Sequence, residues 1–170
     1  GPLIAANDGT VWIANFHAMD YLRNGRLSAI QTGRGLPGTY VTTMFEDHAG
    51  RIWVGMDNVV WAYDHGAFRA VRHADGSALG IIFAITEDIH HNIWVRAGPN
   101  LDRISNFQLQ EESTSPQISM AYMMAADPRG GIFLGLVNGD LVHYADGKTQ
   151  TIPSNEVGNT RQIRDLLVEP

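Results

Sequence analysis

Residues 46–55 bring two acids, a histidine and a tryptophan together in the run Glu46-Asp47-His48-Ala49-Gly50-Arg51-Ile52-Trp53-Val54-Gly55. Carboxylates and imidazoles are the groups that acid–base catalysis and metal binding use. Asp88, Asp127 and the adjacent pair His90-His91 could complete such a set. The first question is therefore whether these groups share one site or belong to separate structural elements.

The segment around Trp53 returns three more times along the chain. We call its position the anchor, and the other anchors are Trp12, Trp94 and Phe133. Successive anchors lie 41, 41 and 39 residues apart. A period near 40 residues is typical of the four-stranded blades of a β-propeller. The repeat therefore predicts several similar blades.

A turn signal precedes the anchors. Aspartate stands six residues before three of them, and glycine stands three residues before three of them: Asp47, Asp88 and Asp127, and Gly9, Gly50 and Gly130. Aspartate can accept a hydrogen bond from its own backbone two residues on, and glycine supplies the positive φ of a short hairpin. In the third repeat we expect His91 or Asn92 to adopt the left-handed conformation.

These repeated residues are interpreted as structural. One aspartate per blade places the carboxylates on separate hairpins, and the turn role explains them without catalysis. The repeated Trp12, Trp53 and Trp94 are expected in the core between blades, with their indole N–H groups bonded. His90-His91 is a hairpin tip rather than a metal site. We therefore predict no catalytic residue, no bound metal and no cofactor.

The fold class that follows is all-β, a propeller fragment of about four four-stranded antiparallel blades plus one extra strand. No helix longer than a turn is expected. The first blade begins partway through its first strand. The predicted blades cover residues 3–31, 39–72, 80–111 and 118–152, and the first strand of a fifth blade covers 161–169.

Composition narrows the class of protein. The 170 residues are 44% hydrophobic and 18% charged, as in an ordinary globular protein. The absence of cysteine excludes disulfides and Cys-ligated zinc. A formal charge of -6 with scattered arginines argues against nucleic-acid binding. No apolar run reaches the roughly 18 residues of a membrane span, so direct membrane insertion is not expected.

Ligand-binding candidates lie where loops of one propeller face meet the inner strands. Arginine, asparagine, aspartate and aromatic side chains there suit a polyhydroxylated or anionic sugar. The alternative is that they are ordinary polar loop residues. The candidates are His17, Arg34, Tyr40, Asp57, Asn58, His73, Arg96, Asn100 and Arg161.

Residues 41–55, continuing to Tyr63, Gly66 and Phe68, resemble the two-component regulator propeller repeat. The resemblance implies a sensor segment of a seven-bladed ring, in the periplasmic part of a bacterial hybrid two-component protein. It also implies a small-molecule ligand such as an oligosaccharide, and an output module such as a histidine kinase outside these residues.

Two other functions remain open. A weaker likeness to propeller lyases related to streptogramin lyase keeps an enzyme in view, although no His and Glu pair can be nominated. A protein-interaction scaffold also fits the fold. Because four blades would leave two apolar blade faces uncovered, we expect contact with further blades or a second copy, for example as an eight-bladed ring.

Overall fold

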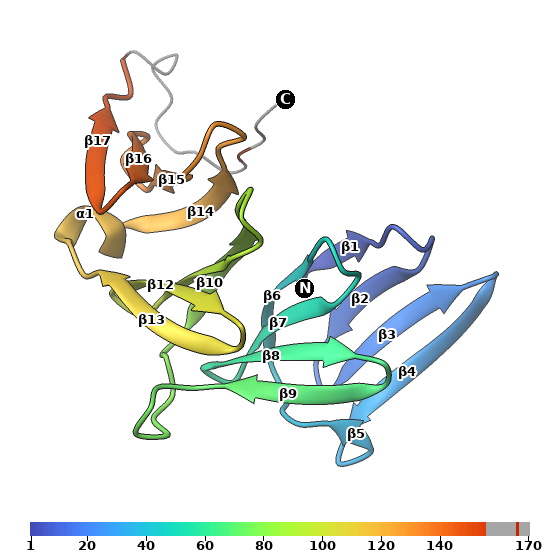
Figure 1. Ribbon diagram of the computed structural model, residues 1–170. Helices are drawn as coiled ribbons and strands as arrows, with labels where there is room; N and C mark the ends of the chain where they lie inside the picture. Colours follow the sequence, from blue (N-terminus) through green and yellow to red (C-terminus); the bar gives the residue numbers. More distant parts are fainter. Residues whose placement is uncertain (156–165, 167–170) are drawn as a thin grey trace. The chain divides into compact units, whose positions relative to one another are not determined.

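The computed structural model describes residues 1–155 and residue 166, and it confirms the all-β fold class (Figure 1). Arg161 and most of the strand expected at 161–169 lie outside the described residues. The elements are β1 (Leu3–Ala5), β2 (Val11–Asn15), β3 (Ala18–Arg23), β4 (Arg26–Thr32), β5 (Gly35–Leu36), β6 (Val41–Glu46), β7 (Ile52–Met56), β8 (Val59–Asp64), β9 (Ala67–Val71), β10 (Ile82–Glu87), β11 (Ile93–Ala97), β12 (Asn100–Ser105), β13 (Gln108–Ser113), α1 (Pro116–Ser119), β14 (Ala121–Ala126), β15 (Ile132–Leu136), β16 (Leu141–Ala145) and β17 (Lys148–Ile152).

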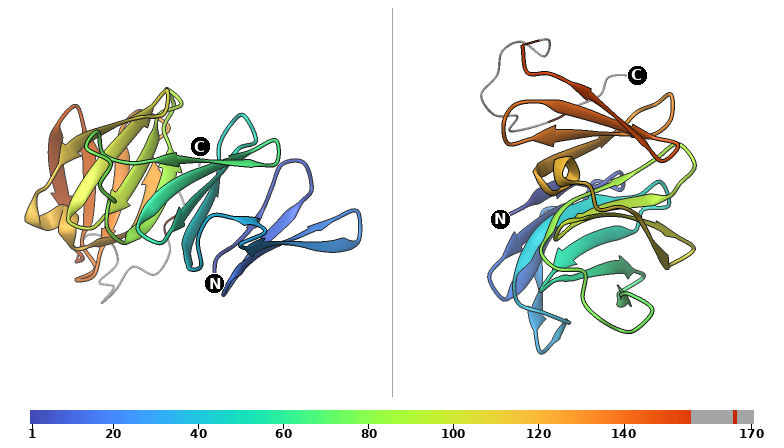
Figure 2. Two further views of the ribbon diagram at one scale, coloured as in Figure 1. Left: turned by 90° about the horizontal axis from the view of Figure 1, so that it is seen from below. Right: turned by 90° about the vertical axis from the view of Figure 1, so that its left-hand side faces the viewer.

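The strands form four sheets in which chain neighbours pair in order. Blade 1 is β1-β2-β3-β4-β5, blade 2 is β6-β7-β8-β9, blade 3 is β10-β11-β12-β13 and blade 4 is β14-β15-β16-β17. The pairing is antiparallel except between β4 and β5, which run parallel. Figure 2 shows each sheet as a twisted meander of hairpins. The chain divides into two compact units, Gly1–Ile82 and Phe83–Pro170.

The Asp-x-x-Gly turns form as predicted. In blade 2 the Asp47 carboxylate accepts from the N–H groups of Ala49 and Arg51, both at 3.0 Å, and Gly50 has φ 79°. Asp88 accepts in the same way from His90 at 2.8 Å. His91 has φ 63°, which confirms the left-handed residue expected in the third repeat. The repeated aspartates therefore close hairpins.

The three tryptophan anchors are buried in the hydrophobic core, as the repeat predicts, whereas the Phe133 anchor is half-buried. In the first unit the Trp12 ring lies 5.1 Å from Tyr21 and 5.3 Å from Tyr63, the latter edge-on. In the second unit Trp94 meets Tyr144 edge-on at 5.7 Å. Each unit thus joins its two blades through an anchor of one blade and a tyrosine of the next.

Two elements were not anticipated. The connector after blade 1 contains β5, and the connector before blade 4 contains α1, a single turn that begins after Ser115. The Ser115 hydroxyl accepts from the N–H of Ile118, and Pro116 is compatible with a first helical position because its missing N–H would have no partner there. No helix among the described residues is long and apolar enough to cross a membrane.

Candidate functional site

Each blade presents two kinds of loop at opposite ends of its strands. The Asp-x-x-Gly turn joins the first and second strands at one end, which we call the hairpin end. The turn between the second and third strands, together with the connector from the preceding blade, forms the other end, which we call the connector end. The sequence-predicted ligand residues that the structure describes lie at or near the connector end, and six of them belong to the first unit.

An exposed aromatic pair marks the connector end of the first unit. Phe16, in the turn between β2 and β3, is 75% exposed, and Tyr40, just before β6, is 52% exposed. Their ring centres are 5.5 Å apart with a 35° angle between the planes. Tyr40 is among the predicted residues, whereas Phe16 is not, because the sequence alone does not show that Phe16 meets Tyr40.

Asp57 holds Tyr40 in place. Its carboxylate accepts from the N–H groups of Thr39 at 2.7 Å and Tyr40 at 3.0 Å, and the N–H of Asp57 donates to the Tyr40 carbonyl at 3.2 Å. Asp57 and Asn58 both have positive φ, 49° and 66°, so they form the tight turn between β7 and β8. Asp57 therefore positions the aromatic residue instead of offering its carboxylate to a ligand.

His17 completes this group. Its backbone N–H donates to the Thr39 carbonyl at 3.0 Å, and its carbonyl accepts from the N–H of Thr32 at 2.9 Å. The His17 side chain is exposed beside the aromatic pair in sequence. The structure thus brings three predicted residues, His17, Tyr40 and Asp57, to the same stretch of backbone at Thr39.

A surface hollow of about 350 Å³ adjoins the aromatic pair. Its lining includes Asn15, Phe16, Tyr40 and Thr42. Gly1 and Pro2 also line the hollow, while the Asn15 amide donates to the Asp20 carboxylate and the Thr42 hydroxyl donates to the Gly55 carbonyl. The two exposed rings beside a concave surface are therefore what makes this place a candidate small-molecule site.

The remaining candidates of the first unit are dispersed. Arg34 is exposed in the turn between β4 and β5, and the Asn58 carbonyl accepts from the N–H of Leu79 at 2.9 Å. His73 starts a tight turn in which its carbonyl accepts from the N–H of Gly76 at 2.9 Å. The described contacts of these residues are backbone contacts that shape the connectors.

Arg96 has a different place from the one expected. It lies within β11, is 1% exposed, and donates to the carbonyls of Ile118 at 2.6 Å and Ser119 at 2.7 Å and also to the carbonyl of Gly98. Burial lowers the pKa of its guanidinium, but arginine remains charged at neutral pH. The side chain therefore fastens α1 to blade 3. Asn100, the first residue of β12, donates to the Glu111 carboxylate at 3.1 Å.

The carboxylates of the hairpin end are occupied by their own hairpins. The Asp47 carboxylate accepts from the Trp53 indole N–H at 2.7 Å and from the Arg51 guanidinium at 2.7 Å. Burial raises the pKa of Asp47, but the Trp53 and Arg51 donors outweigh it and leave the pKa below its usual value. The Asp88 carboxylate likewise accepts from the Trp94 indole at 2.7 Å. An ionised, fully bonded carboxylate is a poor proton acceptor at neutral pH.

Blade 4 uses a different donor. Phe133 replaces the tryptophan, and the His143 ring lies 4.6 Å from the Phe133 ring. The Nε2 atom of His143 is 3.2 Å from the Asp127 carboxylate and 3.3 Å from the Gly130 carbonyl. Both neighbours of Nε2 are acceptors, so this nitrogen carries a proton. The imidazole therefore takes the place of the indole N–H.

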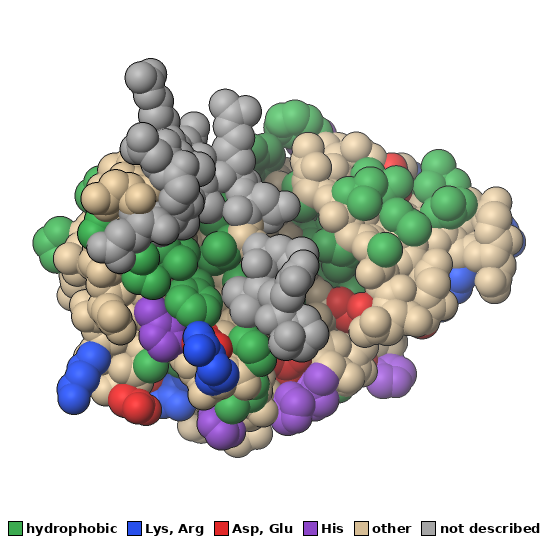
Figure 3. Space-filling model, turned by 90° about the horizontal axis from the view of Figure 1, so that it is seen from above, with side chains coloured by type: hydrophobic (Ala, Val, Ile, Leu, Met, Phe, Trp, Pro, Cys, Tyr) green, Lys and Arg blue, Asp and Glu red, His purple; other side chains and the backbone are tan. Residues whose placement is uncertain are grey.

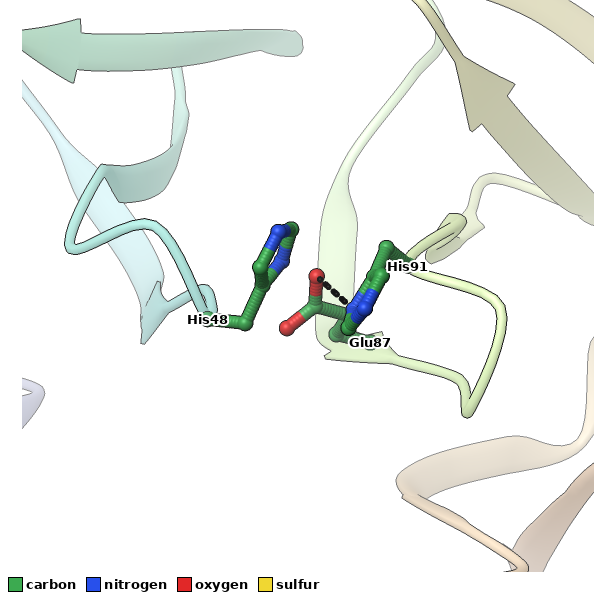
Figure 4. Close-up of side chains that lie close together, drawn as sticks. All are labelled: His48, Glu87 and His91. Carbon is green, nitrogen blue, oxygen red and sulfur yellow. Dashed lines mark ion pairs between the residues drawn. The ribbon is translucent and has the colours of Figure 1, made fainter.

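The hairpin end also carries hollows, of about 510 Å³ in the first unit and 860 Å³ in the second. In the larger one, the Glu112 carboxylate pairs with Arg103 at 2.7 Å, and Asp127 pairs with Arg129 and His143. Figure 4 shows His91 in the turn after β10, where its Nδ1 lies 3.4 Å from the Glu87 carboxylate. Because these groups already satisfy one another, the connector end is the better candidate.

Comparisons with known proteins agree with the fold. The model of the family "Two component regulator propeller" matches residues 35–58, which confirms the resemblance at blade 2. Among curated protein sequences none matches the chain.

Several solved structures share the architecture. The extracellular domain of BT4673 from B. thetaiotaomicron, a proposed one-component system, is 21% identical with a TM-score of 0.72. That of BT3049 from B. thetaiotaomicron, a proposed hybrid two-component system, is 18% identical with a TM-score of 0.77. Both alignments cover 96% of this chain and 23% of the other. A protein assigned as a gluconolactonase is 14% identical with a TM-score of 0.53, and the alignment covers 88% and 56% of the two chains. At these identities the likeness shows the propeller fold.

Proposed function

We propose that this chain, whose residues 35–58 carry the two-component regulator propeller repeat, is a non-catalytic ligand-sensing segment of a bacterial two-component regulator. The support is the family match together with four blades of matching architecture. The similar BT4673 and BT3049 structures are extracellular domains, which favours a periplasmic or outward-facing location. The ligand signal would pass to an output module, such as a histidine kinase, outside these residues.

The observation that carries a binding role is the exposed pair Phe16 and Tyr40 beside the 350 Å³ hollow. Exposed aromatic side chains that gather at a concave surface mark interaction sites. Their faces suit the apolar face of a sugar ring, and the exposed His17 side chain follows Phe16 directly in the sequence. A small neutral molecule such as an oligosaccharide is the ligand class that this composition fits best.

Alanine substitution of both rings tests the site. Titration calorimetry against a panel of oligosaccharides should find a ligand for the wild-type chain. F16A/Y40A should bind that ligand at least about tenfold more weakly, which corresponds to about 1.4 kcal/mol of lost contact. Because both rings are exposed, the melting temperature should change little.

Ile89→Ala is the matched control, since Ile89 is an exposed apolar residue of a hairpin turn, 48% accessible. It should bind like the wild type. Full affinity in F16A/Y40A would refute the assigned position of the site, whatever the ligand proves to be.

An enzyme is the second candidate, favoured by the likeness to the gluconolactonase structure. Lactone hydrolysis and ring-opening assays on the purified chain separate the two functions. Turnover that disappears on substitution of an acid or histidine would favour the enzyme, whereas saturable binding without turnover favours the sensor. A protein-interaction scaffold would instead show partner binding with no effect of small molecules on melting temperature.

A further inference from the structure

The hairpin end of each unit contains a hollow between its two blades, and the two hollows are built on the same plan. The hollow of the first unit is lined by the anchor Trp12 of blade 1 and by Tyr63 of blade 2. That of the second unit is lined by Trp94 of blade 3 and Tyr144 of blade 4. In both, the tryptophan and the tyrosine meet edge-on, with ring centres 5.3 Å and 5.7 Å apart. The two hollows can therefore be compared position by position.

In the second unit, acidic side chains satisfy the polar groups of both rings. The Trp94 indole N–H donates to the Asp88 carboxylate at 2.7 Å, and the Tyr144 hydroxyl donates to the Glu112 carboxylate at 3.3 Å. Glu112 also pairs with Arg103 at 2.7 Å. The hollow of the second unit therefore contains its own hydrogen-bond acceptors.

The first unit has neither of these acids. Ala6 stands six residues before Trp12, at the position where the other tryptophan anchors have aspartate. Glu112 is the extra residue at a bulge of β13, whereas β4 pairs regularly with β3 and has the apolar residues Ala29 and Ile30 at the same level. Two carboxylates are thus replaced by apolar groups in the first unit.

These replacements leave two donors of the first hollow without acceptors. Trp12 is 6% exposed, and Tyr63 is half-buried. Within residues 1–155 and 166, neither the Trp12 indole N–H nor the Tyr63 hydroxyl has a hydrogen-bond partner. Burial raises the pKa of Tyr63, so its hydroxyl keeps the proton at neutral pH and acts as a donor. A buried donor without an acceptor is unfavourable, and an oxygen atom bound beside it removes that penalty.

Arg23 supplies a positive charge at the same hollow. It lines the hollow, its Nε donates to the Thr10 hydroxyl at 2.8 Å, and its guanidinium pairs with Asp8. Arg23 is also close enough to Tyr63 to oppose the rise of the tyrosine pKa. In blade 2 an arginine likewise accompanies the aspartate of the turn. The first hollow therefore keeps the cation and the donors that surround a carboxylate in blade 2.

The acidic residues of this hollow already have donors. The Glu46 carboxylate accepts from the N–H of Asn7 at 2.8 Å, and the Asp64 carboxylate lies 2.6 Å from Nδ1 of His65. Figure 3 shows acidic side chains close to basic and histidine side chains on the surface that it draws. The negative charges near the hollow disfavour a phosphate or another polyanion, so a group with a single negative charge fits best.

We infer that this hollow binds a small carboxylate, which takes the place beside Ala6 that an aspartate side chain occupies in blades 2 and 3. The carboxylate accepts from the Trp12 indole N–H and the Tyr63 hydroxyl and lies close to Arg23. Residues of blades 1 and 2 alone supply these groups. The site is separate from the aromatic pair at the connector end.

The indole N–H resonances of the four tryptophans test this inference on the whole chain. During titration with sodium acetate at constant ionic strength, the Trp12 resonance, assigned with Trp12→Phe, should move and saturate. The Trp53 and Trp94 resonances should stay in place, because their N–H groups already donate to aspartates. Acetamide, the neutral analogue of acetate, should leave the Trp12 resonance unchanged.

Glucuronate and glucose distinguish the two sources of a carboxylate. A Trp12 response to acetate shows that a free carboxylate is sufficient. A response to glucuronate but not to acetate assigns the carboxylate to a sugar ring. Glucose should have no effect on the Trp12 resonance in either case.

Ala6→Asp supplies the carboxylate from the chain itself. It should move the Trp12 resonance without any ligand and weaken acetate binding at least about tenfold. Ala74→Asp, which adds the same charge in an exposed connector turn, should bind acetate like the wild type. Tyr63→Phe, which removes only the hydroxyl, should weaken binding about three- to tenfold, and it keeps the test valid if Ala6→Asp does not fold.

A Trp12 resonance that responds to neither acetate nor glucuronate would overturn the inference. An equal response to acetamide or glucose would also overturn it, as would acetate binding that a folded Ala6→Asp leaves intact. The result does not depend on the sensor site at the connector end, because F16A/Y40A should bind acetate like the wild type.

Discussion

At the scale of single residues, the repeated aspartate links the turn of a blade to its anchor. One carboxylate oxygen of Asp47 accepts from backbone N–H groups of the turn, and the other accepts from the Trp53 indole. Asp88 and Trp94 repeat the arrangement, whereas blade 1 carries Ala6 in place of the aspartate. The spacing of six residues between aspartate and tryptophan therefore has a physical reason, a hydrogen bond across the hairpin.

The pH dependence of stability should reflect these carboxylates. The pKa values of Asp47 and Asp88 lie below their usual range in the folded chain. Each therefore contributes stability above the usual aspartate pKa, near 4, that is lost as pH falls through its lower folded value. Urea midpoints measured from neutral pH down to about pH 2 should fall in the wild type, and the fall should be smaller in D47N/D88N.

The control for that experiment is Asp75→Asn. The Asp75 carboxylate accepts from the exposed backbone N–H of Ser77. Replacing Asp75 should therefore lower the free energy of unfolding at neutral pH by less than replacing Asp47. Equal acid sensitivity in the wild type and D47N/D88N would contradict the assigned role of the hairpin carboxylates.

In blade 4 the His143 imidazole replaces the indole N–H as the donor to the aspartate, and this difference gives a second prediction. His143→Ala removes the Nε2 donor from Asp127 and should destabilise the chain by about 1 kcal/mol. Adding Phe133→Trp should recover much of this loss, because an indole N–H then reaches the carboxylate as in blades 2 and 3. A double-mutant cycle from urea unfolding measures the coupling. Additive effects of the two substitutions would show that His143 and the anchor position act independently.

At the scale of the elements, the hairpins were predictable and the connectors were not. Repetition in sequence defines the hairpins, since Asp-x-x-Gly and the anchor recur with the blade. The connectors contain what does not repeat, so β5 and α1 left no periodic signal. One signal was available for Arg96, because it stands two residues after its anchor, where blades 2 and 4 carry Gly55 and Gly135. A position that holds glycine in other blades leaves little room for a side chain, so a side chain at this position is expected to be buried.

Arg96 should therefore stabilise α1. Arg96→Met keeps much of the side-chain volume but leaves the carbonyls of Ile118 and Ser119 without their buried donor. We expect a loss of about 2–4 kcal/mol in unfolding free energy and faster hydrogen exchange at residues 116–120. Arg34→Met, at an exposed position, should change neither. Unchanged exchange at α1 in Arg96→Met would contradict the fastening role.

At the scale of the whole molecule, repetition separates structure from function. The acids, histidine and tryptophan of residues 46–55 belong to the repeated framework. The aromatic pair Phe16 and Tyr40 does not repeat as a pair. Of the predicted ligand residues, Tyr40 lines the hollow, the His17 backbone N–H donates to the Thr39 carbonyl, and Asp57 orients Tyr40. Phe16 escaped prediction because only the fold brings it to Tyr40, across two strands and a connector.

Chemical-shift mapping of a bound oligosaccharide on the isotope-labelled chain tests the sensor account most directly. The account predicts that the largest shifts fall on residues 15–17 and 39–42, around the aromatic pair, and vanish in F16A/Y40A. Shifts concentrated on the hairpin end, at Asp88, Asp127 and their neighbours, would contradict it, as would a binding ligand that leaves the backbone around Tyr40 unperturbed.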